Sequence, residues 1–223
     1  MEFNEIINQL ESLKNEENIK GMARFKIDPS KVYGVRIPEL RKIAKKTGKN
    51  HKLALELWDY GFHETRLLAT MIDEAELVNE EQLEKWVHDF NTWDITDQAC
   101  LNLFDKVPLA REKIFQWCNS DFEFVKRCAF SLIAVLTVHD KEASDDYFRG
   151  FFQIIKEASI DERNFVKKAV NWALRFIGKR SKDLNIEAIE VSNELLNMDS
   201  KSAKWIARNA LKELESSKVQ SKF

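Results

Sequence analysis

A tryptophan and two carboxylates occur close together in residues 91–98, at the start of an apolar stretch of the chain. Trp93 and Asp97 are four residues apart, so on a helix they lie on the same face, with Asp94 on a neighbouring face. The face of a tryptophan attracts a cation, and a carboxylate stabilises positive charge that develops in a transition state. The chemistry that this segment could perform is therefore the stabilisation of a cation.

Each of these residues also has a structural interpretation. Trp93 could belong to the core, because tryptophan is usually largely buried, and Trp172 lies in a strongly apolar run of its own. Asp94 is best explained as a helix cap or as a hydrogen-bond partner that supports the turn. Asp97 could form a structural salt bridge with Arg127.

The composition favours a soluble, all-helical protein. Of 223 residues, 44% are hydrophobic and 32% are charged, whereas only six are glycine and three are proline. Glycine and proline break helices and punctuate strand-rich folds, so their scarcity favours helices. The chain has no apolar run of the roughly 20 residues that span a bilayer, and its acidic, amphipathic N-terminus does not resemble a signal peptide. We therefore expect a cytoplasmic protein that has no membrane partner.

The cysteines and histidines give no sign of a metal site. Cys100, Cys118 and Cys128 occur singly within apolar helical patterns, and the four histidines lack the spacing of metal ligands. Isolated cysteines of odd number are typical of reduced core thiols in a cytosolic protein. We expect no metal, no cofactor and a monomer without an obligate protein partner.

Helical patterns follow one another along the chain, separated by short polar segments. The longest irregular piece is 26–35, after which Pro38 begins a helix at a position where its missing N–H is not needed. Asn79 and the pair Asp199-Ser200 are suitable helix caps. The predicted helices span residues 3–13, 18–25, 38–47, 53–60, 63–72, 80–90, 93–104, 109–118, 122–138, 145–158, 161–177, 186–196 and 200–214.

A pattern of apolar, charged and then small residues recurs along these helices. The small residue is an alanine, which allows close helix packing, and successive alanines are 30, 30, 40 and 41 residues apart. A helix pair of a HEAT-type solenoid has about 40 residues. We therefore predict an all-α, HEAT-like helical-repeat solenoid that forms a single domain over residues 1–223. The repeat alanines are Ala69, Ala99, Ala129, Ala169 and Ala210.

The position two residues before each alanine would form a ladder along one surface of a solenoid. Three of the five positions are basic, and an ordinary solvated face is the alternative interpretation. Further basic residues cluster in 36–49, 175–182 and 201–212, whereas acidic residues concentrate in 73–84 and 140–146. This segregation predicts a concave basic surface that binds a phosphate backbone, although the formal net charge is −2. The ladder positions are Leu67, Asp97, Arg127, Lys167 and Arg208.

Three stretches of the sequence together resemble one protein family. They are residues 92–97, residues 125–129 (Val-Lys-Arg-Cys-Ala) and residues 165–175, which contain Trp172 and Arg175. In their order and spacing they resemble the AlkD-type DNA alkylation repair family, and the resemblance takes in residues 33–41 and nearly the whole length. The family comprises HEAT-like-repeat DNA glycosylases that excise N3- and N7-alkylated purines. It also includes relatives that bind branched or unusual DNA without excision.

The resemblance implies a role for each matching residue. Trp93 and Trp172 match the two pocket tryptophans, and Asp97 matches the catalytic carboxylate, to which Asp94 lends support. Arg127 matches the key arginine that contacts phosphate. Phe25 falls where the family has an aromatic tyrosine near the DNA. The other phosphate partners that we expect are Lys126, Lys167, Arg175, Arg208 and Arg36.

The function implied is that of a metal-free, monofunctional glycosylase acting on double-stranded DNA with alkylated bases, without a tight base-flipping pocket. Two alternatives are a non-catalytic HEAT-repeat protein that binds branched or unusual DNA structures, and a HEAT scaffold that binds proteins. Asp97 favours the glycosylase over the DNA binder, because a binder has no reason to keep an acid among phosphate-binding cations. The basic ladder argues against the protein-binding scaffold.

Overall fold

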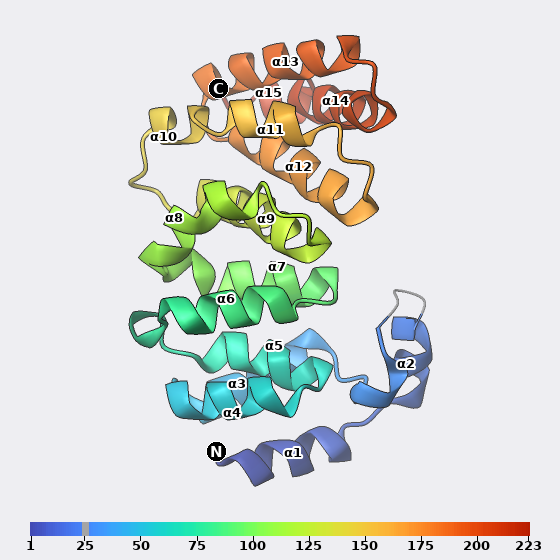
Figure 1. Ribbon diagram of the computed structural model, residues 1–223, viewed down its shortest axis with the longest axis vertical. Helices are drawn as coiled ribbons and strands as arrows, with labels where there is room; N and C mark the ends of the chain where they lie inside the picture. Colours follow the sequence, from blue (N-terminus) through green and yellow to red (C-terminus); the bar gives the residue numbers. More distant parts are fainter. Residues whose placement is uncertain (24–26) are drawn as a thin grey trace. The chain divides into compact units, whose positions relative to one another are not determined.

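The computed structural model describes residues 1–23 and 27–223, and every regular element in those ranges is a helix (Figure 1). The prediction of an all-α fold is therefore confirmed. No helix in these ranges is long and apolar enough to cross a membrane. Phe25, for which the sequence predicts a DNA contact, lies outside the described residues.

The chain forms two compact units, Met1–Val107 and Pro108–Phe223. The expectation of one repeat domain over the whole chain stays a prediction, and the units are described separately. In the first unit α3 and α4 pack on α5, and α5 packs on α7. Its elements are α1 (Phe3–Ser12), α2 (Glu16–Ala23), η1 (Pro29–Lys31), α3 (Ile37–Thr47), α4 (His51–Tyr60), α5 (His63–Ile72), η2 (Ala75–Leu77), α6 (Glu80–Asp89), α7 (Trp93–Asn102) and η3 (Phe104–Lys106).

In the second unit α9 packs on α8 and α12, and α14 packs on α12 and α13. The helix α9 is the most buried of this unit, because almost every residue from Val125 to Thr137 is covered by neighbours. The elements are α8 (Pro108–Trp117), α9 (Glu123–His139), α10 (Asp145–Arg149), α11 (Phe152–Ala158), α12 (Asn164–Ile177), α13 (Lys182–Asn197), α14 (Lys201–Leu214) and α15 (Ser217–Gln220).

The repeat alanines lie at helix contacts within each unit. Two belong to α5 and α7, and three belong to α9, α12 and α14. Their side chains are completely buried, which confirms the prediction of close packing at these positions. A larger side chain there would force the helices apart, because core packing leaves few voids. The five are Ala69, Ala99, Ala129, Ala169 and Ala210.

Most predicted helices are present, and the expected caps act as caps. The side chain of Asn79 accepts a hydrogen bond from the N–H of Gln82 at 2.9 Å, and Ser200 caps α14 in the same way through Ala203. The start of α13 was placed too late, because Ser181 caps the helix through the N–H of Leu184 at 3.2 Å. The short C-terminal helix α15 was not predicted.

Two further predicted helices differ in extent from the structure. The single helix expected over 145–158 is broken into α10 and α11, and Gly150 lies at the break, where its low helix propensity favours interruption. The helix expected from Asp161 begins only at Asn164. The helix begins later than predicted because the Asp161 carboxylate accepts a hydrogen bond from the N–H of Arg163 at 3.0 Å and forms a turn there.

Candidate functional site

The first turn of α7 is tied to α5 by an acid–base pair. His63 Nε2 lies 2.8 Å from Asp94 Oδ2, and His63 is only 5% exposed. Burial alone would raise the pKa of Asp94, but the hydrogen bond and the charge of His63 hold that pKa below its ordinary value. Asp94 thus contacts α5 from the first turn of α7. Its partner His63 was missed, because nothing local in the sequence links residues 31 positions apart.

The two functional candidates on α7 differ in exposure. Trp93 is 36% exposed, whereas the core tryptophans Trp58 and Trp86 are 0% and 1% exposed and stack on each other. The core interpretation therefore does not describe Trp93. Asp97, one turn further along, is buried at 9% exposure. The helix combines an aromatic ring that solvent can reach with a carboxylate in a region of low dielectric.

A buried glutamate holds the turn before α3 in place. Glu64 on α5 is fully buried, and its carboxylate accepts the backbone N–H groups of Tyr33, Gly34 and Val35 at 2.9, 2.7 and 3.1 Å. Gly34 has φ +75°, and a Cβ there would meet the carbonyl of Asn15 at 2.4 Å, so only glycine fits. The turn that precedes Pro38 in the family-like segment 33–41 is thereby fixed.

These elements enclose a groove of about 900 Å³, called here the N-terminal groove. It lies between α2, residues 34–38, α5 and α7. Arg36 and Asp94, which the sequence singled out, both line it, and so does Leu67 at the first ladder position. The side chain of Arg36 is exposed and makes one long contact, 3.5 Å from its Nη2 to the amide oxygen of Asn18.

In the second unit, Arg127 is a buried cation on α9. It is 5% exposed, and its Nη1 donates a hydrogen bond of 2.7 Å to the carbonyl of Phe165 at the start of α12. Its neighbour Lys126 pairs with Asp161 at 3.2 Å. Burial would raise the pKa of Asp161, but Arg163 and Lys126 together lower it. These contacts hold α9 against the segment that leads into α12.

The remaining ladder residues of this unit are more accessible. Arg208 on α14 is exposed, and Lys167 on α12 is half-buried, with its ammonium 5.1 Å from the centre of the Trp205 ring. Trp205 itself is only partly buried. Trp172 is also half-buried, and its ring meets that of Phe176 edge to face at 5.8 Å.

Some of the expected phosphate contacts are already neutralised. Arg175 and Lys179 both pair with Glu213 on α14, and the Lys179 pair is 2.6 Å long. Burial would raise the pKa of Glu213, but these two cations lower it. Arg175 can therefore bind a phosphate only in competition with Glu213.

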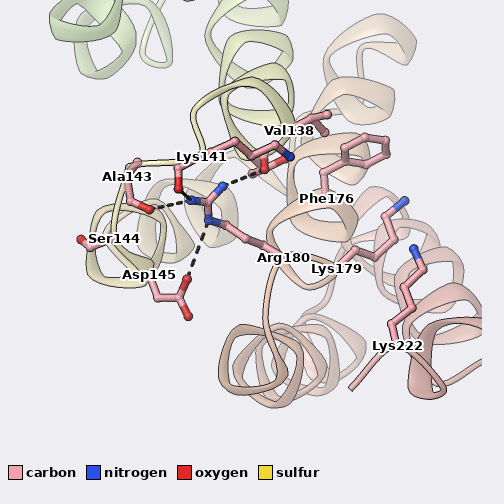
Figure 2. Close-up of a pocket in the computed structure, with 10 residues that line it drawn as sticks. Val138, Lys141, Ala143, Ser144, Asp145, Phe176, Lys179, Arg180 and Lys222 are labelled. Atoms are coloured by element: carbon pink, nitrogen blue, oxygen red, sulfur yellow. Dashed lines mark hydrogen bonds and ion pairs between the residues drawn. The ribbon is translucent and has the colours of Figure 1, made fainter.

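A hollow of about 730 Å³ lies beside these residues in the second unit (Figure 2). Arg180 spans one side of it and donates to the carbonyls of Thr137 and Ala143 at 2.8 and 2.5 Å, so it fastens the segment after α9. Lys179 stands 3.8 Å from the centre of the Phe176 ring. The basic cluster 175–182 is thus largely engaged in holding this unit together.

The structure brings the predicted residues together as two sets. Trp93, Asp94 and Asp97 share α7, and Arg36 faces the same groove as Asp94. Within the second unit, Arg127 and Lys126 on α9 contact the chain around the start of α12, which carries the other candidates, Lys167, Trp172 and Arg175.

Comparison with known families identifies the chain. Residues 6–214 match the model of a family described as "DNA alkylation repair enzyme". The chain belongs to the DNA alkylation repair family. The match extends over both units and includes every candidate residue named above, from Arg36 to Arg208.

Relatives in this family are distant in sequence. "Uncharacterized protein Lin0241" from Listeria innocua serovar 6a is 25% identical over 197 residues, and "Uncharacterized protein Lmo0209" from Listeria monocytogenes serovar 1/2a is 24% identical. Each alignment covers 86% of both proteins. A solved structure described as "a new family of proteins related to the HEAT-like repeat DNA glycosylases with affinity for branched DNA structures" matches with a TM-score of 0.80. It is 20% identical and 96% of each chain is covered, which confirms the HEAT-like repeat fold.

Proposed function

We propose that this protein is a DNA glycosylase that removes cationic N3- and N7-alkylated purines from double-stranded DNA. The observation that carries the proposal is on α7, where the exposed ring of Trp93 lies one turn before the buried carboxylate of Asp97. The His63–Asp94 pair fixes the start of that helix. An aromatic face and an acid on one rigid element suit a cationic ligand.

The chemistry requires little beyond charge stabilisation. An alkylated purine already carries positive charge and leaves as a neutral base when its N-glycosidic bond breaks. Positive charge then develops on the deoxyribose, and water adds to that carbon with loss of a proton, which leaves an abasic site. Asp97 is proposed to stabilise this charge and to orient the water. Trp93 contributes cation–π attraction, about 0.5–2 kcal/mol.

The second unit is proposed to supply further contacts. Trp172 is carried over from the family resemblance as the second tryptophan, and Arg127 as the main phosphate contact. Accessible cations such as Lys167, Arg208 and Arg36 are proposed to bind the backbone, since they have no carboxylate partner within residues 1–23 and 27–223. Lys126 and Arg175 would join them by exchanging Asp161 and Glu213 for phosphate.

A single-turnover excision assay tests the catalytic proposal. The substrate is duplex DNA that carries one 7-methylguanine, and the variants are Asp97→Asn, Arg127→Ala and Trp172→Ala. We expect Asp97→Asn to lose at least about 100-fold in excision rate, the scale of one removed electrostatic contact, while duplex binding is kept or strengthened. Asp183→Asn makes the same change at an exposed acid of α13 and serves as the matched control. Equal excision by wild type and Asp97→Asn would sink the catalytic assignment.

A second candidate is a non-catalytic protein that binds branched or unusual DNA. It is favoured by the fold match to a protein family described as having affinity for branched DNA structures. Binding to a four-way junction is compared with binding to a duplex of the same length and salt concentration. Preference for the junction together with no excision by the wild type would replace the first candidate by this one.

A further inference from the structure

Gly21 is a glycine for which the described residues show no steric or backbone reason. Of the six glycines, Gly34, Gly48 and Gly61 have positive φ, and Gly150 and Gly178 have neighbours that crowd a Cβ. Gly21 shows neither reason, because it lies inside α2 and, among residues 1–23 and 27–223, no atom beyond its own helix backbone lies within 4 Å of a Cβ placed there. Glycine inside a helix costs about 1 kcal/mol relative to alanine. A remaining reason for glycine is the close approach of a ligand to the backbone.

Gly21 is one of the residues that line the N-terminal groove. The groove has a volume of about 900 Å³, within the size range of small-ligand sites. Its surface has both polar and apolar parts. Met22, Leu67 and Pro38 give it apolar walls. A flat organic ring can lie against such walls without losing hydrogen bonds.

Charged groups also line the groove. Lys20 and Arg36 line it and are both exposed, so they can bind a phosphate. The acidic Glu17 also lines it, in the first turn of α2, where the helix dipole favours an acid. Asp94 lines the groove and is bound to His63 through Oδ2, whereas its Oδ1 is buried and has no hydrogen-bond partner of ordinary geometry in the described part of the chain. Cations, apolar walls and a carboxylate suit one nucleotide.

We propose that the N-terminal groove binds a single unpaired nucleotide of a DNA strand. Its phosphate lies at Arg36 and Lys20, and its base lies against the apolar wall and passes close to the backbone of Gly21. The inference rests on DNA binding, which both candidates for the proposed function share, and it adds a preference for DNA in which one base is unpaired.

The test fills the groove without weakening the fold. Gly21→Leu places a side chain in the open space, and leucine is a better helix former than glycine, so α2 should be at least as stable. Gly21→Ala adds only a methyl group and tests how closely the base approaches the backbone. Binding is measured by fluorescence anisotropy at fixed salt, with a paired duplex and with the same duplex carrying one bulged 2-aminopurine nucleotide.

We expect wild type to bind the bulged duplex at least about fivefold more tightly, the scale of one or two hydrogen bonds. Gly21→Leu should bring the ratio of the two affinities close to one and keep the affinity for the paired duplex, and Gly21→Ala should already lower that ratio, because the base passes close to the backbone there. The emission of 2-aminopurine should change on binding wild type but not Gly21→Leu. Thermal unfolding verifies that both variants are folded.

The outcomes separate the two proposals. Binding of both duplexes with equal affinity by wild type would overturn the groove proposal and leave DNA binding intact. An unchanged ratio in a folded Gly21→Leu would do the same. Failure of wild type to bind either duplex would overturn the proposed function and, with it, the nucleotide site.

Discussion

His63 on α5 and Asp94 on α7 are joined by a 2.8 Å hydrogen bond, so a neighbouring helix fixes the turn that carries Trp93. His63→Ala would leave the partly buried Asp94 carboxylate without this partner. We expect a loss of about 1–3 kcal/mol in the free energy of unfolding, measured by urea denaturation. His88→Ala, on the exposed part of α6, should change it by less than about 0.5 kcal/mol. Equal losses in the two variants would show that the pair does not stabilise α7.

Glu64 should be among the most sensitive residues of the first unit. Its two carboxylate oxygens serve three backbone N–H groups, and a Glu64→Gln variant keeps one acceptor oxygen and gains a donor amide. We expect a loss of about 2–3 kcal/mol in urea denaturation, because buried donors would lose their partner. Glu56→Gln, at an exposed pair 3.9 Å from Lys52, is the control and should be nearly neutral. Similar losses for both would contradict this role for Glu64.

Asp161 predicts a pH dependence of stability. Although burial would raise its pKa, Arg163 and Lys126 lower that pKa below the ordinary value of about 3.9. A carboxylate with a depressed folded pKa stabilises the fold above its unfolded pKa and loses this contribution as the pH falls through its folded pKa. Wild type should therefore be more stable than Asp161→Asn near pH 6. The difference between their free energies of unfolding should close below about pH 4. A difference in the free energy of unfolding that is constant from pH 3 to pH 7 would contradict the predicted pH dependence.

Salt dependence can separate accessible cations from neutralised ones. Lys167→Ala should reduce the slope of log affinity against log salt by about 0.9, the value for one lost phosphate contact. Glu213→Gln should instead strengthen duplex binding, since it releases Arg175 and Lys179 from their acid. Lys52→Ala on α4 is the control with an unchanged slope. A Glu213→Gln variant that binds no more tightly than wild type would remove Arg175 from the DNA contacts.

The periodic parts of the fold could be predicted from the sequence. A buried alanine at a recurring position is a local signal, and all five alanines are indeed completely buried. Helix caps such as Asn79 are also local, since cap and partner lie within three residues. The break at Gly150 was missed, because a single glycine is tolerated in many helices and only packing decides the outcome.

The candidate site was predictable only in part. Trp93, Asp94 and Asp97 were found because they lie within five residues of one helix and match a family pattern. His63 and Glu64 were not found, because their partners are about 30 residues away and depend on how α5 packs. The pairing of Arg175 with Glu213, 38 residues apart, was missed for the same reason, so a cluster of cations in sequence overstated the available positive charge.

The buried alanines restrict how such a chain can change in length during evolution. Adding or deleting one residue inside α12 would rotate the rest of that helix by about 100° around its axis. The side chains of Lys167 and Ala169 would then no longer both keep their present orientation relative to α9. A length change between the repeat helices has no such effect. The longer spacing before Ala169 arises there, because α10, α11 and the segments around them separate α9 from α12. Insertions should therefore accumulate in such connections, while the helices that carry the ladder keep a constant number of residues.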